Sequence, residues 1–344
     1  MRNSIVLIIP AYNEELTIAD CILGFNETGV FSKIYVVNNA STDRTSSIAK
    51  KVFAENNIPG GVLFEGKKGK ASAVKHAFEN IDADNYVLVD ADLTYDPKDL
   101  TKLLAKFEEE QADMVVGDRL SSGGYAKQNV RMFHNWGNNF VKNLINYLFK
   151  AQLRDVMSGY RVFSSKFVRS YPALCHGFEI ETDMSIHALD KGFKIVEVPV
   201  SYYPRPENSE SKLNTYSDGV KIVNKIIFLM KDYKPLTFFG ICGLGLFALG
   251  FITGIPAIMD YALNRYVEHV PLAILATGLM ILATILLGVG LILDTVVFHQ
   301  KLSYELLTRK NKSALKFNSI SENDPAVASV TAGEQDNRQQ QWHD

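Results

Sequence analysis

The sequence is poor in cysteine, and this limits the kinds of protein that it can encode. Its 344 residues include three cysteines, Cys21, Cys175 and Cys242, which are widely separated. Three thiols cannot all pair within one chain, and their spacing does not match a metal site. We therefore expect a reduced, cytosolic main domain without a disulfide framework.

The chain also lacks an excess of charge of either sign. Its formal net charge is −2, so it shows no basic footprint of the kind that nucleic-acid-binding proteins carry. The first apolar run ends at Pro10 and is too short for a secretory signal or a membrane span, and we interpret it as a strand. We expect about two domains from the length and no nucleic-acid partner.

Charged residues are missing altogether from two long stretches. Residues 236–259 and 271–293 contain no Asp, Glu, Lys or Arg, and each is long enough to cross a bilayer core, which takes about 20 apolar residues. Two buried core helices are the alternative, but core helices seldom run so far without charge. We therefore predict a transmembrane hairpin over residues 236–299, with spans at 236–259 and 271–298.

Basic residues indicate how this hairpin is oriented. Lysines precede the first span, Lys and Arg follow the second, and the short connection carries charges of both signs. By the positive-inside rule, both chain ends and the main domain face the cytosol, as in a two-span protein of a bacterial or archaeal inner or plasma membrane. Residues 214–235 alternate apolar and basic groups at helical spacing, which indicates a juxtamembrane amphipathic helix. The polar residues 300–344 predict a largely disordered cytosolic tail.

The first 213 residues follow another pattern. Short apolar runs, such as "SIVLIIP", "KIYVVNN", "GVLFEG", "YVLVD" and "DMVVGDR", alternate with helical stretches. Strands that are apolar on both faces and joined by helices predict an α/β domain with a mainly parallel sheet. Further helices are expected at 129–150 and 177–190. Ligands of such sheets bind beyond the carboxyl ends of the strands.

Three carboxylates stand where one of these strands ends. In "YVLVDADLTYDP", Asp90, Asp92 and Asp96 follow the apolar run. Residues i and i+2 of an extended segment point the same way, so Asp90 and Asp92 form a candidate site for Mg²⁺ or Mn²⁺, which prefer hard oxygen ligands. A solvated turn is the alternative. Asp96 precedes Pro97 and a helical pattern, which favours a role as helix N-cap.

A second candidate site precedes these carboxylates. The stretch "GKKGKASAVKHAF", residues 66–78, places glycines and lysines before a helix. Backbone N–H groups, lysines and a helix N-terminus together favour phosphate, although a plain basic loop is the alternative. With an acidic pair one strand later, the combination indicates a nucleotide diphosphate.

Several motifs in this order resemble those of family 2 glycosyltransferases. They are "PAYNEE" (10–15), "NNASTD" (38–43), "KKGKA" (67–71), "DAD" (90–92), "GDR" (117–119), "SGYRVFS" (158–164), "GFEIETDMSIHAL" (177–189) and "EVPVSYYPRPENSESKLNTYSDG" (197–219). The resemblance covers about residues 3–235 and is closest to the dolichol-phosphate mannose synthase-like branch. It implies a GT-A fold, Rossmann-like with a mainly parallel sheet, over residues 1–213, and a hexosyltransferase that makes polyprenyl-phosphate sugars.

The resemblance also implies roles for particular residues. Asn38 or Asn39 would read the donor base through an amide, Asp90 would contact the ribose or the metal, and Asp92 would bind the metal directly. The residues implied to bind the donor nucleotide are Pro10, Tyr12, Asn13, Glu14, Asn39, Asp43, Lys70, Asp90, Ala91 and Asp92.

Basic residues in separate motif blocks are implied to hold phosphate groups. Arginine forks match phosphate oxygens, and the implied acceptor-phosphate residues are Arg119, Arg131, Arg161 and Lys212. With Asp92 and Arg205, Arg119 and Arg131 form the implied catalytic set.

The function expected from these observations is inverting sugar transfer from a UDP- or GDP-linked donor to polyprenyl phosphate, by a membrane-bound homo-oligomer. A phosphate acceptor is largely ionised at neutral pH and needs no general base. The rival is transfer to a sugar hydroxyl in polysaccharide synthesis, which would need a base, and Glu179, Glu181 and Asp183 are the candidates. A catalytically inactive membrane scaffold is the non-enzymatic alternative.

Overall fold

The computed structural model describes residues 4–121, 132–172, 180–205, 227, 228 and 230–322. The chain divides into two compact units, Met1–Val223 and Asn224–Asp344, and each is described here by itself. Most of the predicted juxtamembrane helix, residues 214–235, lies outside the described residues. The predicted domain end at residue 213 also lies there.

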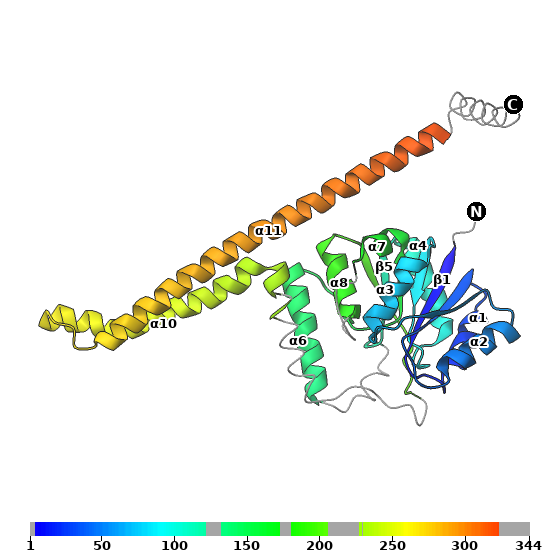
Figure 1. Cartoon of the computed structure of the whole chain (residues 1–344), viewed down its shortest axis with the longest axis horizontal. Helices are drawn as coiled ribbons and strands as arrows, with labels where there is room; N and C mark the ends of the chain where they lie inside the picture. Colours follow the sequence, from blue (N-terminus) through cyan, green and yellow to red (C-terminus); the bar gives the residue numbers. More distant parts are fainter. Residues whose placement is uncertain (1–3, 122–131, 173–179, 206–226, 229, 323–344) are drawn as a thin grey trace, which may run out of the picture. The chain divides into compact units, whose positions relative to one another are not determined.

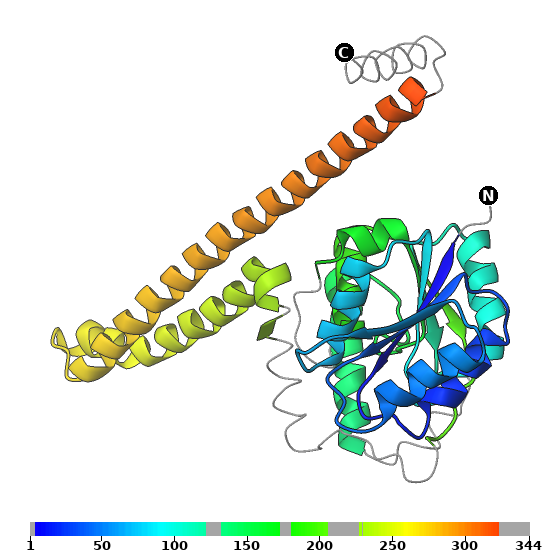
Figure 2. The same cartoon turned by 45° about the vertical axis from the view of Figure 1, so that its right-hand side comes forward.

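The first unit is built on a seven-stranded sheet with the order β3-β2-β1-β4-β6-β5-β7 (Figures 1 and 2). The strands are β1 Ile5–Ala11, β2 Lys33–Asn38, β3 Gly60–Phe64, β4 Asn85–Leu88, β5 Met114–Asp118, β6 Arg161–Ser164 and β7 Ile195–Pro199. All neighbouring pairs are parallel except those of β6, which is antiparallel to both β4 and β5. The predicted α/β class with a mainly parallel sheet is confirmed, but β6 was not predicted.

Helices cover both faces of this sheet. The helices of this unit are α1 Ile18–Asn26, α2 Thr45–Glu55, α3 Lys70–Asn80, the 3₁₀ turn η1 Pro97–Asp99, α4 Leu100–Glu109, α6 Met132–Phe149, α7 Ser165–Ser170 and α8 Ile180–Asp190. Alternate residues of β1 enter different cores: Leu7 and Ile9 pack with α1, α2 and α4, whereas Val6 and Ile8 pack with α3, α7 and α8. This alternation follows from the two-residue period of a strand, and it explains why the strands are apolar throughout.

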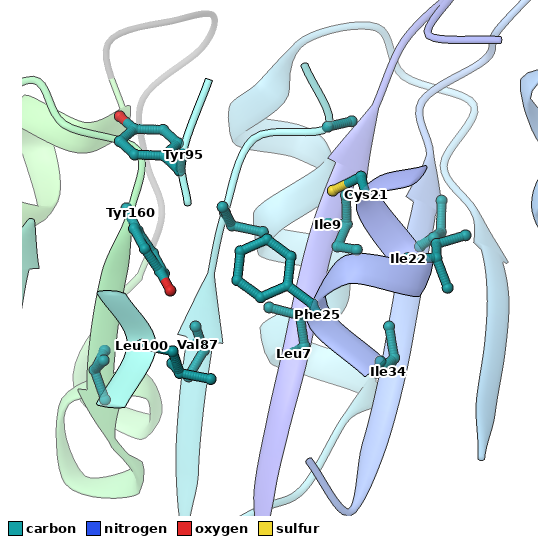
Figure 3. Packing of buried hydrophobic residues seen from close by; sticks show 14 of the residues in the cluster. Leu7, Ile9, Cys21, Ile22, Phe25, Ile34, Val87, Tyr95, Leu100 and Tyr160 are labelled. Atoms are coloured by element: carbon teal, nitrogen blue, oxygen red, sulfur yellow. The ribbon is translucent and has the colours of Figure 1, made fainter. Parts of the chain in front are cut away.

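Aromatic side chains link the first of these cores to the strand ends. Phe25 of α1 meets Tyr160 edge-on, with ring centroids 5.8 Å apart, and Tyr160 contacts Tyr95 at 5.3 Å (Figure 3). Tyr95 in turn contacts Tyr202 at 5.4 Å. This chain of rings ties α1 to the segment after β4 and the segment after β7, and it stiffens the edge of the sheet where ligands are expected.

The second unit consists of two long helices, α10 Pro235–Asn264 and α11 Val270–Glu322. Both contain stretches that are long and apolar enough to cross a membrane. The helices extend beyond the predicted spans 236–259 and 271–298. α11 continues as helix to Glu322 and so includes the first part of the predicted polar tail, residues 300–344.

Small residues allow α10 and α11 to approach closely. Gly243 lies against Ala283, and a Cβ at Gly250 would lie 3.2 Å from the carbonyl oxygen of Ala276. The contact positions recur every seven residues: Gly243, Gly250 and Ala257 on α10, and Ala276, Ala283 and Gly290 on α11. Close packing of small residues is the usual basis of helix association in a lipid environment.

A leucine at Gly250 should therefore weaken the hairpin, by about 1–3 kcal/mol as for other overpacked sites. A Cβ there would lie 3.1 Å from Leu279 and 3.2 Å from Met280. Gly245 is the matched control on the same helix, because a Cβ there meets nothing within 4 Å. The measurement is SDS-induced separation of fluorescent labels on α10 and α11 in detergent micelles. Equal destabilisation by Gly250→Leu and Gly245→Leu would contradict close packing of α10 and α11 at Gly250.

Candidate functional site

The candidate site lies at the carboxyl edge of β1, β2, β3 and β4. The ends of β1, β2 and β3 are level in the sheet, since Ala11 pairs with Asn38 and Asn38 with Phe64. The segments that follow these strands carry most of the predicted donor-binding residues. Because parallel strands deliver their following loops to one edge, residues far apart in sequence meet there.

The loops after β1 and β2 are held together by side-chain hydrogen bonds. Asn13 has a positive φ of 54°, and its side-chain oxygen accepts from the Thr42 backbone at 2.8 Å. Asp43 accepts from the backbone N–H groups of Thr45 at 3.0 Å and Glu15 at 3.2 Å. Asp43 therefore shapes the predicted nucleotide loop from within, whether or not it also contacts the nucleotide.

Two predicted donor residues have side chains that face the interior. Pro10 is a buried member of β1, and Ala91 is 3% exposed. Tyr12 differs, since its hydroxyl accepts from Lys68 Nζ at 3.4 Å and its ring lies 5.4 Å from the same ammonium. Tyr12 thus joins the loop after β1 to the lysine-rich loop.

The structure gives the two asparagines contacts within the protein. Asn39 is 3% exposed; its amide donates to the Lys67 carbonyl at 2.7 Å, and its oxygen accepts from the Gly69 N–H at 2.6 Å. Asn38 is also buried and accepts from the Ser41 N–H. The Asn39 amide and the Asn38 side-chain oxygen therefore bond within the protein and hold these loops in place. An aspartate at position 39 would lose the bond to Lys67.

Lys70 is the first residue of α3 and lies between two carboxylates. Its ammonium bonds both Asp90, after β4, and Glu181, in the first turn of α8. Burial alone would lower the pKa of Lys70, but the two carboxylates outweigh it and raise the pKa above its ordinary value, so Lys70 stays charged. The Asp90 carboxylate also packs on Gly159, where an added Cβ would collide with Asp90 Oδ2. Gly159 therefore leaves space for this carboxylate.

Asp92 is held by its own turn and by a distant arginine. Its Oδ1 accepts from the Thr94 backbone at 3.2 Å and the Thr94 hydroxyl at 2.6 Å. Its Oδ2 lies 2.7 Å from Arg205 Nη2. Leu93, between Asp92 and Thr94 in the sequence, has a φ of 60° as part of this tight turn. The structure therefore places two members of the predicted catalytic set, Asp92 and Arg205, in direct contact.

Asp96 has a different role from the other two carboxylates. Its side chain accepts from the Lys98 N–H at 2.9 Å at the start of η1, with Pro97 as the first residue of the turn. The predicted helix N-cap is confirmed.

The predicted phosphate-binding residues fall into three groups. Arg119 pairs with Asp155 through Nε at 2.8 Å and Nη2 at 2.9 Å. Burial favours a raised pKa for Asp155, but the Arg119 guanidinium overcomes it and holds the pKa below its usual range. Arg161 is fully buried and donates to the carbonyls of Ser158 and Val156. Its predicted contact with the acceptor phosphate is wrong, because no surface of Arg161 is accessible. Arg131 and Lys212 lie outside the described residues.

Sequence reasoning missed Asp155 and the true position of Glu181. Asp155 meets Arg119 across 36 residues, and Glu181 meets Lys70 across 111. Contacts between residues so far apart in the sequence leave no recognisable local pattern. The one available signal was the presence of Asp155 close to the "SGYR" motif and of Glu181 within "ETD".

The residues present suit a divalent cation in part. Asp90 and Asp92 offer carboxylate oxygens at the end of one strand, which are suitable ligands for Mg²⁺ or Mn²⁺. Among the described residues, no group of three or more His, Cys, Asp or Glu side chains is arranged to hold a metal. A bound ion would therefore depend on oxygens from the substrate as well, which is the usual situation for Mg²⁺ beside a nucleotide.

Comparison with known proteins agrees with this architecture. Residues 6–171 match the family described as glycosyl transferase family 2. The glycosyltransferase AglJ of Haloferax volcanii is 29% identical over 86% of this chain and 94% of its own length. The low-salt glycan biosynthesis hexosyltransferase Agl6 of the same organism is 31% identical over 72% of this chain and 57% of its own.

A solved structure shows the same fold. Glucosyl-3-phosphoglycerate synthase from Mycobacterium tuberculosis, in complex with Mn²⁺ and uridine-diphosphate-glucose, aligns with a TM-score of 0.51 and 20% identity, over 67% of this chain and 79% of that one. Residues 6–171 thus form a glycosyl transferase family 2 domain with a GT-A-like fold, and two apolar helices come later in the chain. Its family and its relatives identify it as a glycosyltransferase.

Proposed function

We propose that this glycosyltransferase transfers a hexose, with inversion, from a UDP- or GDP-linked donor to a polyprenyl phosphate at the cytosolic face of a membrane. Its helices α10 and α11 would anchor the catalytic domain beside the lipid acceptor, with both chain ends in the cytosol. The relatives in glycan biosynthesis and the two apolar helices support this proposal. A hydroxyl acceptor in polysaccharide synthesis is the rival.

One observation carries the choice between these acceptors. Of the three carboxylates that could act as a base, Glu181 is 6% exposed and paired with Lys70. Asp183 accepts from the Tyr171 hydroxyl at 2.7 Å. Glu179 lies outside the described residues. A hydroxyl acceptor needs a base within reach of its proton, whereas a phosphate arrives ionised. The two described candidates are already engaged, which favours the phosphate.

A divalent ion would be held chiefly by Asp92, with Asp90 beside it and the donor diphosphate completing its ligands. When bound, such an ion stabilises the negative charge that develops on the leaving diphosphate. The neighbouring protein with Mn²⁺ and uridine-diphosphate-glucose is consistent with this assignment. Lys70 keeps Asp90 oriented, and Thr94 fixes the rotamer of Asp92.

The reaction also requires two anions to approach each other. The acceptor phosphate must approach a donor that already carries a diphosphate, so positive side chains must screen the repulsion and fix the geometry. Arg205 stands at Asp92, and Arg119 is positioned by Asp155. Arg131 and Lys212 are the further residues proposed for the acceptor phosphate.

The test compares Arg131→Ala with Glu181→Gln and Asp183→Asn. With a phosphate acceptor, Arg131→Ala should slow transfer by roughly 10²-fold, as expected for the loss of a charge-stabilising group. The two carboxylate variants should stay within about tenfold of wild type, because no proton is removed by a base. Initial rates are measured at saturating nucleotide sugar, with polyprenyl phosphate and free sugar offered separately. A carboxylate variant that is 10³-fold slower, beside a nearly normal Arg131→Ala, would establish the hydroxyl acceptor instead.

A further inference from the structure

The carboxylates Asp90 and Asp92 each have a protein cation, but the two cations are held very differently. Lys70, at Asp90, is 11% exposed and is bound on its other side by Glu181. Arg205, at Asp92, is 34% exposed, while the Asp92 side chain itself is 6% exposed. Lys70 is thus fixed within the domain, whereas Arg205 reaches a buried carboxylate from the surface.

The backbone that carries Arg205 is fixed close to the turn of Asp92. The Tyr203 N–H donates to the Thr94 carbonyl at 2.9 Å, and Tyr95 and Tyr202 form an isolated antiparallel bridge. Arg205 is two residues beyond Tyr203, so its side chain would remain beside the site after leaving Asp92.

Arg205 occupies the oxygen of Asp92 that a metal ion would use. Oδ1 is bound twice by Thr94, whereas Oδ2 faces Arg205. Mg²⁺ binds carboxylate oxygen at about 2.0–2.1 Å, and two cations at one oxygen repel each other strongly when water is excluded. A divalent ion and the Arg205 guanidinium therefore compete for Asp92 Oδ2.

We propose that Arg205 competes with the divalent ion for Asp92, so that the ion binds tightly only together with a nucleoside diphosphate. The diphosphate supplies the displaced guanidinium with a new anionic partner, to which an arginine fork is well matched. Metal and diphosphate then favour each other's binding, and this coupling is reciprocal. The inference rests on the proposed metal at Asp92, but it does not depend on which acceptor receives the sugar.

The experiment measures Mn²⁺ binding to the full-length protein in detergent, from the electron paramagnetic resonance signal of free Mn²⁺, with and without UDP or GDP. Arg205→Gln should bind Mn²⁺ alone about two- to fivefold more tightly than wild type, the size expected when a partly exposed ion pair is removed. The diphosphate should tighten Mn²⁺ binding in wild type by a larger factor than in Arg205→Gln. Arg205→Lys keeps the charge and should stay close to wild type.

Arg169→Gln is the matched control for the loss of a positive charge. Arg169 pairs with Asp82, which precedes β4, whereas Asp92 follows it, so the control lies toward the other end of the strand and should leave Mn²⁺ binding unchanged. Asp92→Asn should abolish binding. Equal or weaker Mn²⁺ binding by Arg205→Gln, or no Mn²⁺ binding by any variant even with nucleotide, would overturn the inference. Failure to glycosylate polyprenyl phosphate would refute the proposed acceptor and leave the Mn²⁺ result intact.

Discussion

Asp92→Asn is expected to reduce sugar transfer by about 10³-fold, the upper range for loss of a preorganised charge-stabilising group, while the domain stays folded. The substitution removes the charge that we propose binds the metal. An asparagine can keep the hydrogen bonds that Oδ1 receives from the Thr94 N–H and hydroxyl, so the turn should survive. Initial rates with a radiolabelled nucleotide sugar measure the loss, and circular dichroism confirms the fold.

Asp96→Asn is the control on the same segment. Asp96 caps η1 by accepting from the Lys98 N–H, and asparagine is as good a cap as aspartate. We expect activity within about threefold of wild type, because a cap exchange of this kind changes stability by no more than a few tenths of a kcal/mol. Complete loss of activity in both variants would contradict the division between a metal-binding and a capping carboxylate.

Lys70→Met should produce the largest loss of stability, about 3–5 kcal/mol in the free energy of unfolding. The substitution would leave Asp90 and Glu181 close together without the ammonium that both of them bond. Removing one member of a buried ionic group leaves uncompensated charge, which costs more than the group contributed as a whole. Urea unfolding of the protein in detergent, followed by circular dichroism, measures the effect.

Two further variants make this prediction specific. Lys75 is on the same helix, is 46% exposed and pairs with Glu79 at 3.7 Å, so Lys75→Met should cost less than about 0.5 kcal/mol. The double variant Lys70→Met with Glu181→Gln should recover part of the stability. It removes one of the two negative charges that Lys70→Met leaves without an ammonium. A double variant no more stable than Lys70→Met would show that the ammonium acts through some other contact.

The arrangement of the site also explains why Lys70 and Arg205 have different roles. Lys70 connects α3, the strand end at Asp90 and α8, so its main contribution is to hold the site together. Arg205 pairs with Asp92 from the surface, and we propose that it exchanges this partner for a phosphate. The same type of contact, cation to carboxylate, therefore serves structure in one case and, as we propose, ligand exchange in the other.

The sequence by itself determined the architecture and the location of the site. Uncharged stretches of helical length indicated α10 and α11, and the apolar strands joined by helices indicated the parallel part of the sheet. The position of Asp90 and Asp92 directly after a strand placed them at the carboxyl edge. These features depend on period, length and order along the chain, and such properties are visible in the sequence without knowledge of distant contacts.

Only the tertiary structure decided what individual polar side chains do there. Arg161, predicted to face a phosphate, is buried in β6, and Asn39, predicted to read a base, clamps the loop that ends at Gly69. Glu181, considered as a base, is the partner of Lys70. A polar side chain acquires its role from the groups that satisfy its hydrogen bonds and charge. Those groups come from strands and helices far away in sequence, so spacing alone does not identify them.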